Sequence, residues 1–566
     1  MHPPAPRNGH QPHHPNGDAT SNGHPAPNME QLYVVPDHGP CPPNRTLFEA
    51  FEWYLPAQHN HWRRLADRIP SLAALGVTDL WIPPACKGAW YTSNGYDVYD
   101  LYDLGEFDQR GARQTKWGSK EELLRLVDVA NRHGVGVLFD AVLNHMTGAD
   151  ETERVLAVNV DTNDRRQEIS TPHQIEAWTK FNFPGRGDTY SPLRWTAEHF
   201  TGVDYDQASK TNGIWKFLGK EWAPDVDGEF GNYDFLHPEV RRNFFHWVQW
   251  LASQMRLGGL RLDAVKHISA SFMRDFVGLV QNTVGRDWLL LGEYWSGDVK
   301  ALLGYLEQLD HRISLVDVPL VESFSRISRG EQPDLRRVFE NTLAAIKPNN
   351  AVQTGQTLET PVEPFFIPIA YALILLRANH GTPCVFWCDL YGTLLPSRPG
   401  PAPLGGLLTA RLMLARKLWA YGTEAAYFCG KGAETCVGFT RFGHPARSGG
   451  AGLAVVANTG FERAARRMCV GSRHAGERWT DLLRQVWGVV VVDAAGYAEF
   501  PVGPRGVSVW VHEMAEGRDV VEGLTSFRAP MQIWPRSRSA VTRFGRLPEP
   551  VLHCTCSKGK ILARFG

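Results

Sequence analysis

The 566-residue sequence lacks a long apolar run, an excess of charge of one sign and a regular cysteine spacing. Without about 20 consecutive apolar residues, we expect no transmembrane helix. Residues 1–28 are rich in Pro, His, Gly and Asn without an apolar stretch, so no secretory signal is predicted and we expect a cytoplasmic protein. The formal net charge of −1 gives no reason to expect nucleic acid or a membrane surface as a partner.

The nine cysteines are an odd number for a disulfide framework, and they lack the spacing of metal ligands. Cys554 and Cys556 are too close in sequence to pair readily. We therefore expect free thiols, as in a reducing compartment. The irregularly spaced histidines near the N-terminus predict disorder rather than a metal site.

What the sequence does have is a repeated alternation of strand and helix patterns. A strand is predicted from Val77 to Ile82, and a helix with Leu123 and Leu126 on its apolar face ends before Gly134. Such alternation, sustained over hundreds of residues, predicts a parallel sheet closed into a (β/α)8 TIM barrel. Further strands are expected at Val135–Leu143, at Val316, Val318 and Leu320, and at Cys384–Trp387.

The alternation lapses between His145 and Asp234, which predicts an inserted domain, and short strands after Gly422 predict a C-terminal antiparallel β domain. We therefore expect five segments: a disordered segment 1–43, a catalytic barrel 44–145 and 235–422, an inserted domain 146–234, a C-terminal β domain 423–514 and an irregular tail 515–566.

Two carboxylates follow apolar strand patterns. Arg261 and Asp263 are two residues apart in one strand, so both side chains point to the same side. A guanidinium beside Asp263 keeps that acid ionised, as a carboxylate nucleophile must be. Glu293 ends the next strand, Leu289–Glu293. Two such acids are the minimum equipment for hydrolysing a glycosidic bond.

Six motifs occur in order along residues 46–513, and together they resemble the α-amylases of glycoside hydrolase family 13, most closely the branch of bacterial liquefying and fungal intracellular enzymes. They are Phe51–Tyr54, Trp81–Pro84, Tyr99–Phe107, Asp140–His145, Arg261–His267 and Gly292–Trp295. The resemblance implies a barrel with a domain inserted after strand 3, a C-terminal β-sandwich, and retaining hydrolysis of internal α-1,4 bonds in starch or glycogen.

The resemblance also implies a role for individual residues. Asp263 would be the nucleophile and Glu293 the general acid/base. The substrate-binding residues would be Tyr96, stacking on a sugar ring, His145 beside that sugar, Arg261 beside the nucleophile, and Lys266, His267 and Trp295 on the leaving-group side. Core packing remains an alternative for Tyr96, and a structural Arg–Asp pair remains one for Asp263.

The sequence departs from the family pattern twice. The segment Gln353–Glu359 directly follows Asn349–Val352, so the Asn-His-Asp motif with the family's third acid is absent. His380 has no following Asp and is not a substitute. An aspartate-rich segment is also absent between Leu236 and His237.

The second gap bears on a calcium ion, which the resemblance implies as a cofactor. Asn144, Asp234 and the backbone carbonyl of His267 remain as ligands, and one or more carboxylates are lost, which predicts a weakened site. Thr201 and Ala223 stand where bacterial relatives carry carboxylates for additional ions.

We therefore expect a monomeric α-amylase-type glycosidase acting on α-1,4-glucan. Two alternatives stay open: a glucan transferase of the same family, and a non-catalytic glucan-binding protein that has lost its third acid. The two gaps are either real features of a degenerate paralogue or errors of the gene model.

Overall fold

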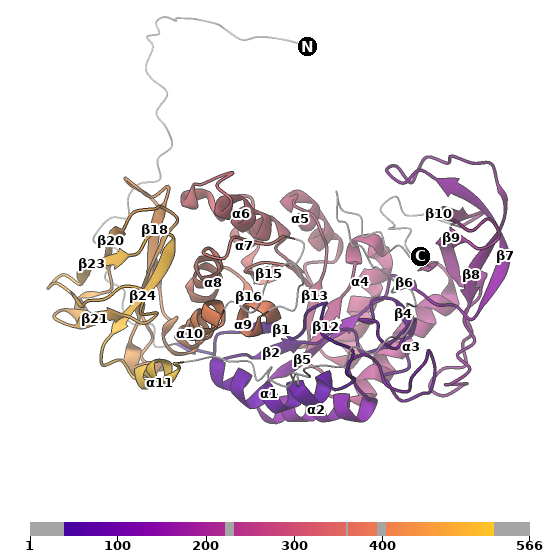
Figure 1. Ribbon diagram of the computed structural model, residues 1–566, viewed down its shortest axis with the longest axis horizontal. Coiled ribbons are helices and arrows are strands. Elements are labelled where there is room, and N and C mark those ends of the chain that lie inside the picture. The colour runs from indigo at the N-terminus through magenta and orange to yellow at the C-terminus, as the bar shows by residue number, and fades with distance from the viewer. Residues whose placement is uncertain (1–38, 221–230, 358–359, 393–402, 526–566) are drawn as a thin grey trace, which may run out of the picture.

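A computed structural model describes residues 39–220, 231–357, 360–392 and 403–525. Eight parallel strands form a closed barrel in the order β1-β16-β15-β14-β13-β12-β5-β2. The barrel lies between two antiparallel β regions, one built from the chain inserted after β5 and one from the C-terminal part (Figure 1). The predicted TIM barrel is thereby confirmed.

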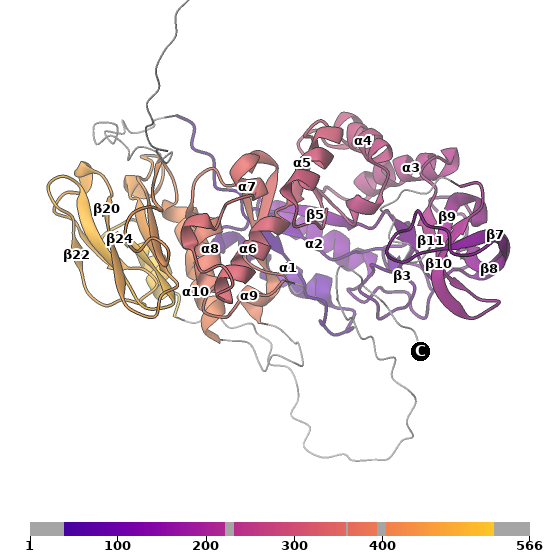
Figure 2. The ribbon, with the colours of Figure 1, turned by 90° about the horizontal axis from the view of Figure 1, so that it is seen from above.

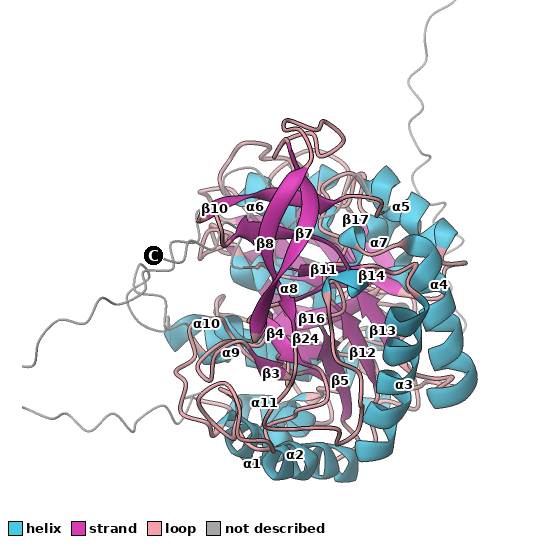
Figure 3. Cartoon of the chain, turned by 90° about the vertical axis from the view of Figure 1, so that its right-hand side faces the viewer, coloured by secondary structure: helices cyan, strands magenta, loops and turns pink. Residues whose placement is uncertain are grey.

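The barrel strands are mostly buried, as expected for a parallel sheet covered on both faces. They are β1 (Leu47–Glu49), β2 (Asp79–Trp81), β5 (Gly136–Ala141), β12 (Gly259–Leu262), β13 (Leu289–Gly292), β14 (Ser314–Val316), β15 (Ala351–Thr354) and β16 (Thr382–Phe386). The main helices around them are α1 (His61–Leu75), α2 (Lys120–Arg132), α3 (Pro238–Gln254), α4 (Ala270–Leu279), α5 (Val299–Gln308), α6 (Val318–Ser328), α8 (Ile367–Leu376) and α10 (Pro403–Trp419). Figures 2 and 3 show these helices outside the strands.

The barrel interior is a packed apolar cluster rather than a pore. Its buried members come from six strands and the residue after Asp317: Leu47, Leu138, Leu291, Val316, Val318, Val352 and Cys384. Trp81 and Trp295 are partly buried against this cluster. The polar residues at the carboxyl ends of the strands therefore rest on an apolar floor.

One predicted strand was wrong in extent. Val316, Val318 and Leu320 alternate as a strand would, but β14 ends at Val316. Asp317 then caps α6, because its carboxylate accepts a hydrogen bond from the Leu320 backbone N–H at 3.3 Å. A short helix, α7 (Leu343–Ile346), is held by the same carboxylate, which accepts from the N–H of Leu343 and Ala344.

The chain between β5 and β12 forms a six-stranded antiparallel sheet, in the order β6-β11-β9-β10-β7-β8. Its strands are β6 (His145–Met146), β7 (Glu151–Val160), β8 (His173–Lys180), β9 (Phe200–Asp206), β10 (Thr211–Phe217) and β11 (Gly231–Tyr233). Residues 221–230, including Ala223, lie outside the described residues. The first strand of this sheet begins at His145, directly after the third barrel strand and its following turn.

The C-terminal part forms a second six-stranded antiparallel sheet, β17-β18-β19-β24-β21-β22, and a two-stranded sheet, β20-β23. The strands are β17 (Glu424–Tyr427), β18 (Cys436–Arg441), β19 (Leu453–Asn458), β20 (Ala464–Cys469), β21 (Arg478–Asp481), β22 (Val490–Val491), β23 (Tyr497–Val502) and β24 (Gly506–His512). Apolar residues of both sheets share a core that includes Val456, Met468, Phe500 and Trp510. This arrangement confirms the predicted C-terminal β domain.

The ends of the chain are only partly described. The predicted disordered segment 1–43 falls mostly on residues 1–38, outside the described residues. The predicted irregular tail begins with a short helix, α11 (Arg518–Gly523), and continues into residues 526–566, which also lie outside them. None of the seven cysteines within the described ranges forms a disulfide. None of the helices in those ranges is both long and apolar enough to cross a membrane.

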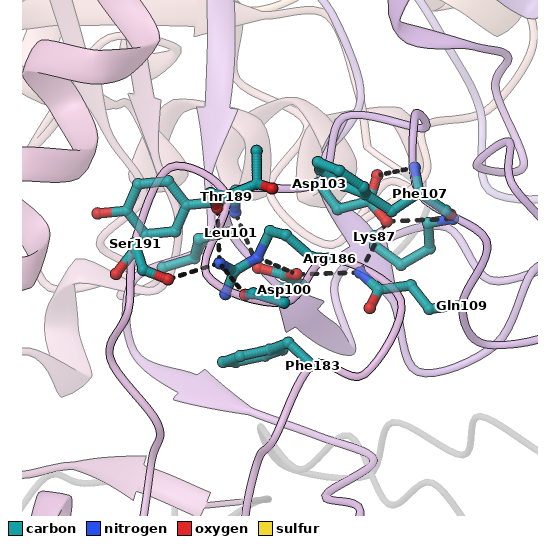
Figure 4. Close-up of polar contacts among 12 residues, drawn as sticks. Lys87, Asp100, Leu101, Asp103, Phe107, Gln109, Phe183, Arg186, Thr189 and Ser191 are labelled. Carbon is teal, nitrogen blue, oxygen red and sulfur yellow. Dashed lines mark hydrogen bonds and ion pairs between the residues drawn. The ribbon is translucent and has the colours of Figure 1, made fainter.

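A buried charge network fixes the hairpin of β3 (Lys87–Gly88) and β4 (Val98–Asp100). The Lys87 ammonium donates to three backbone carbonyl oxygens at 2.7–3.0 Å and lies 3.3 Å from the Asp103 carboxylate (Figure 4). Gln109 Nε2 donates to both Asp100 and Asp103, at 2.9 and 2.8 Å. The carbonyl oxygens belong to Phe107, Ala112 and Arg113, so Lys87 holds this loop closed around its ammonium group.

The same network reaches the inserted segment through Arg186. Its Nε donates to Asp100 at 2.7 Å, and its Nη1 donates to the carbonyl oxygens of Thr189 and Ser191, each at 2.8 Å (Figure 4). Both partners of the Arg186–Asp100 ion pair have side chains only 1% exposed. The hairpin and the inserted segment are therefore joined by a buried ion pair with its polar atoms well paired.

Candidate active site

The two predicted acids lie side by side at the carboxyl ends of neighbouring barrel strands. β12 pairs with β13, with Leu262 opposite Gly292, and Asp263 and Glu293 are the next residues in each strand. The Glu293 N–H donates to the Leu262 carbonyl oxygen at 2.9 Å. Ala264 takes a left-handed conformation with φ 47°, which turns its N–H toward the Glu293 carboxylate at 3.2 Å. The chain turn after Asp263 thus helps to orient the acid on the next strand.

Arg261 connects three carboxylates. Its Nη1 donates to Asp140 Oδ1 at 2.8 Å and also to Asp263 Oδ1, and its Nη2 lies 2.9 Å from Glu293 Oε2. The guanidinium is buried. Because one guanidinium contacts both Asp263 and Glu293, the two acids lie close together, as the carboxyl pair of a retaining glycosidase does.

The electrostatics of this cluster follow from burial and from its charge count. Burial raises the pKa of Asp263 and of Glu293, while the positive Arg261 opposes the rise at both. Asp140 raises the pKa of Asp263 further, since a second negative charge disfavours ionisation. Three acids sharing one cation favour holding a proton within the group. Such a cluster can supply a proton donor and an ionised carboxylate at the same time.

Asp140 was not among the predicted site residues. It lies in β5 and is buried, and its Oδ2 accepts from Trp81 Nε1 and from the Tyr96 hydroxyl, each at 2.9 Å. Its position in the Asp140–His145 motif, at the end of a strand pattern, was the available signal. An acid within an apolar strand needs partners, and Arg261 from the adjacent strand is one of them.

Tyr96 and His145 lie together beside this cluster. His145 Nε2 is 2.7 Å from the Tyr96 backbone oxygen. The Tyr96 ring is stacked on Trp53, with centroids 5.7 Å apart and planes 10° apart. Burial raises the pKa of the Tyr96 hydroxyl well above its usual value, so this group stays a hydrogen-bond donor to Asp140. The structure brings Tyr96, His145, Arg261, Asp263 and Glu293 into one site.

The other predicted substrate-binding residues lie at the edge of this group. Lys266 and His267 belong to a short 3-10 helix, Val265–His267, that directly follows the nucleophile candidate, and both are partly exposed. Of these two, His267 is near enough to Glu293 to act on it electrostatically. Trp295 is partly buried and packs on the apolar barrel floor, so part of its ring has a structural role.

No carboxylate of the described residues stands directly at the carboxyl end of β15. The strand ends at Thr354, and Gly355 and Gln356 come next. The Gln356 amide donates to Asp389. Asp317, after β14, is occupied as a helix cap, and His380 precedes β16, at the opposite end of the barrel from Glu293. The third acid of the family pattern therefore has no counterpart here.

Strand β15 carries a sign of the missing segment. Its last two residues, Gln353 and Thr354, are the first two of the Gln353–Glu359 motif. The Gln353 side chain is fully buried, and neither its Nε2 nor its Oε1 has a hydrogen-bond partner among the described residues. A buried unpaired amide is unfavourable, because it gives up its hydrogen bonds to water without replacement.

The predicted calcium ligands are only partly available. Asn144 Oδ1 is buried with no hydrogen-bond partner within the described ranges, so this oxygen is available to bind a cation. Asp234 differs: its Oδ2 accepts from the Lys220 ammonium at 2.9 Å and its Oδ1 from the Leu236 N–H at 3.0 Å. Thr201 donates to the Asn232 carbonyl oxygen at 3.4 Å and adds no charge. With a lysine on its one carboxylate, the set offers few of the six to eight oxygens that calcium takes, so it matches a weakened site.

A separate cluster of His199, His237 and Glu239 has its candidate ligand atoms within 4.8 Å of one another. Both Nδ1 atoms already accept backbone N–H bonds, from Thr196 at 3.0 Å and from Glu239 at 3.3 Å. An accepting Nδ1 leaves the ring proton on Nε2, and His199 Nε2 lies 3.2 Å from Glu239. The cluster is explained as the cap of α3, and a metal would have to displace these bonds.

Comparison with known proteins agrees with the geometry. Residues 55–317 match the family described as alpha amylase, catalytic domain, and residues 454–511 match the alpha-amylase C-terminal family. An alpha-amylase of Bacillus licheniformis is 41% identical over 485 residues, or 83% of this chain and 93% of that protein. A cytoplasmic alpha-amylase of Escherichia coli is 36% identical over 498 residues, or 83% of this chain and 99% of that protein.

Solved structures extend the comparison to the fold alone. The alpha-amylase of Geobacillus thermoleovorans, solved in complex with acarbose, superimposes with a TM-score of 0.55 at 14% sequence identity. The superposition covers 83% of this chain and 98% of that one. A cyclomaltodextrin glucanotransferase superimposes with the same TM-score at 18% identity, so the fold does not separate hydrolases from transferases.

Proposed function

The chain belongs to the α-amylase family of glycoside hydrolases, and from this premise we propose that it cleaves internal α-1,4 bonds of starch or glycogen with retention of configuration. The observation that carries the proposal is the pair Asp263 and Glu293 on one buried guanidinium, at adjacent barrel strand ends. The bacterial relatives, about 40% identical over most of the chain, support the same chemistry.

In this proposal Asp263 is the nucleophile. Its carboxylate attacks the anomeric carbon and forms a covalent glycosyl intermediate, while Arg261 holds the attacking oxygen in place and opposes protonation of the acid. Glu293, with its pKa raised by burial, protonates the departing glycosidic oxygen. It then removes a proton from the water that hydrolyses the intermediate.

The neighbouring residues position the sugar. Tyr96 offers a ring face next to Asp140, and His145 lies at the Tyr96 backbone, so both would contact the sugar beside the nucleophile. Lys266, His267 and Trp295 would contact the glucan on the leaving-group side. Since β15 carries no third acid, we propose that this chain turns over slowly, because one charge that favours the oxocarbenium-like transition state is missing.

Calcium has a minor place in the proposal. Asn144 supplies one unpaired oxygen, whereas Asp234 is neutralised by Lys220, so a calcium ion would bind weakly between the barrel and the inserted sheet. A cytoplasmic location is proposed from the name of the Escherichia coli relative and from the free thiols. The proposed partner is a neutral α-glucan, bound by a monomer.

The test is digestion of a maltooligosaccharide series, with products separated by chromatography and their anomeric configuration followed by NMR. We expect shorter oligosaccharides released first as the α-anomer. Products longer than the substrate would instead establish a transferase. Binding of starch with no cleavage at any enzyme concentration would establish the non-catalytic alternative, which the missing third acid favours. A β-anomeric first product would exclude the retaining mechanism.

A further inference from the structure

The loop between β3 and β4 carries aromatic residues at both ends. Tyr96, at one end, reaches Asp140 with its hydroxyl. Trp90 and Tyr91, at the other end, form a ring pair with centroids 5.3 Å apart. The backbone N–H of Ala89 donates to the Asp97 carbonyl oxygen at 2.8 Å, which closes the base of the loop and fixes both ends relative to each other.

A second segment, from Trp53 to His59, adds rings to both ends of this loop. Trp53 stacks on Tyr96 at 5.7 Å, and His59 stacks on Tyr91 at 6.1 Å with planes 23° apart. The two segments therefore meet twice: once beside the catalytic acids and once away from them. Two stacked ring pairs, Trp53 with Tyr96 and His59 with Tyr91, thus join the two segments.

Lys116 ties the two segments together. Its ammonium donates to the Trp53 carbonyl oxygen at 3.3 Å and to the Asn94 side chain in the middle of the loop. The His59 backbone is bound to the same stretch, because its N–H donates to the Lys116 carbonyl oxygen at 3.2 Å. His59, and with it the Tyr91 ring that it stacks on, is thus held at a fixed place relative to Trp53 and, through Trp53, to Tyr96. We call Trp90 and Tyr91 the outer pair.

Of the outer pair, Trp90 is exposed and Tyr91 is half-buried. Trp90 is 58% exposed and Trp53 is 41% exposed. Three of the five exposed Trp and Tyr side chains of the described residues, Trp53, Tyr54 and Trp90, belong to these two segments, and the others are Trp178 and Trp487. Exposed aromatic rings clustered beside a catalytic site point to a ligand that covers them.

We propose that Trp90 and Tyr91 form an outer subsite that binds a glucose unit of an α-1,4-glucan chain already held at Tyr96 and Trp53. The inference rests on the proposed function and adds a chain-length preference to it. A glucan fits because the C–H faces of its rings pack on aromatic rings while its hydroxyls remain in water. The outer pair and Tyr96 lie on one short loop whose base is closed by the Ala89–Asp97 backbone bond, so one extended chain can contact both.

The experiment measures binding of two probes, long soluble amylose and maltotriose, to the full chain by calorimetry. All variants carry Glu293→Gln so that neither probe is consumed. The test variants are Trp90→Ala, Trp90→Phe and the double variant Trp90→Ala/Tyr91→Ala. The matched control is Trp487→Ala, since Trp487 is 89% exposed on the C-terminal part of the chain. The single variants at Trp90 guard against misfolding in the double variant, because Trp90 is 58% exposed.

We expect Trp90→Ala to weaken amylose binding about three- to tenfold, the range that one or two ring contacts represent. Trp90→Phe should retain most of the affinity, and maltotriose affinity should not change because a short chain does not reach the outer pair. Amylose binding that is unchanged in Trp90→Ala, or weakened equally by Trp487→Ala, would overturn the outer subsite and leave the proposed function intact. Equal weakening for both probes would overturn it too, since that result indicates a distorted loop. A parent chain that neither binds amylose nor, with Glu293 restored, cleaves it would refute the proposed function and the subsite together.

Discussion

Two buried charge clusters lie within the same molecule and differ in their charge balance. Around Arg261, one guanidinium faces three carboxylates, those of Asp140, Asp263 and Glu293. Around Arg186 and Lys87, two cations face two carboxylates, those of Asp100 and Asp103. The first cluster has excess negative charge, and the second is neutral.

The difference separates a reactive site from a structural one. In the neutral network, backbone carbonyls and the Gln109 amide complete the hydrogen bonding, so the network fixes the β3–β4 hairpin in one shape. Burial raises the pKa of Asp100 in that network too, but Arg186 and Gln109 pair with its carboxylate. In the Arg261 cluster, burial raises the pKa of Asp263 and Glu293 and a neighbouring acid raises each further, so the acids share a proton that can move. Balanced charge therefore serves the scaffold, and unbalanced charge serves the chemistry.

The strongest test of this contrast is Glu293→Gln. We expect kcat to fall about 10²- to 10⁴-fold, because the leaving group loses its proton donor. The unfolding temperature should not fall, since the substitution removes one of three competing negative charges from Arg261. Initial rates on soluble starch and a thermal melt measure the two effects. An unchanged rate would remove Glu293 from the mechanism.

The opposite pattern is expected in the neutral network. Arg186→Met should lower the free energy of unfolding by about 3–5 kcal/mol, because it leaves Asp100 buried without its cation. Urea unfolding followed by fluorescence measures this, and Arg166→Met, in an exposed ion pair with Asp164, serves as the control. Adding Asp100→Asn should recover part of the loss. A loss no larger than that of the control would show that the network is not what holds the hairpin.

The reactive cluster can also be completed. Inserting an eight-residue segment that ends in Asn-His-Asp and returns to the family spacing, between Val352 and Gln353, should raise kcat about 10²- to 10³-fold through the added transition-state contact. The matched control insertion ends in Asn-His-Asn. Equal rates for the two insertions would show that length, and not the third acid, limits this chain.

A smaller effect is expected from Asp140→Asn in the pH profile. Asp263 must be ionised to attack, so the rate falls as pH falls through its pKa. Burial raises that pKa and Asp140 raises it further; removing the Asp140 charge therefore lowers it. The acid limb of the kcat/KM profile should move to lower pH. A limb that moves upward or stays in place would contradict the assigned coupling.

The smallest effect concerns the junction of the inserted sheet and the barrel. Lys220 pairs with Asp234 there, as Lys87 pairs with Asp103. We expect calcium to raise the unfolding temperature of the chain only slightly, because weak binding stabilises little. Restoring the segment between Leu236 and His237, or replacing Lys220 with Met, should enlarge the shift. A large shift at micromolar calcium in the unchanged chain would show that other oxygens complete the site.

The barrel and the two acids could be predicted from the sequence because both depend on local patterns. Apolar runs and helix stops set α2 and β5, and Asp263 and Glu293 follow such runs directly. Partners from distant segments left no such signal. Lys220 reaches Asp234 across the inserted sheet, and Asp140 became a site residue only when Arg261 was placed on the adjacent strand. Asp317 was missed for a different reason: Val316, Val318 and Leu320 alternate, and only the capping geometry shows that a helix begins there.

Strand β15 closes the barrel with Gln353 and Thr354, although the segment that would carry the third acid is missing. The barrel closes because Gln353 and Thr354, which follow the gap, supply the backbone pairing of the missing strand end. The cost is the buried Gln353 side chain, whose amide has no hydrogen-bond partner among the described residues. Quality control in a cell acts on exposed apolar surface and on the population of unfolded chains, and a closed barrel presents little of either. A chain of this kind can therefore persist at normal abundance, and, if its turnover is as slow as proposed, protein level alone would overstate the degradative capacity of its host.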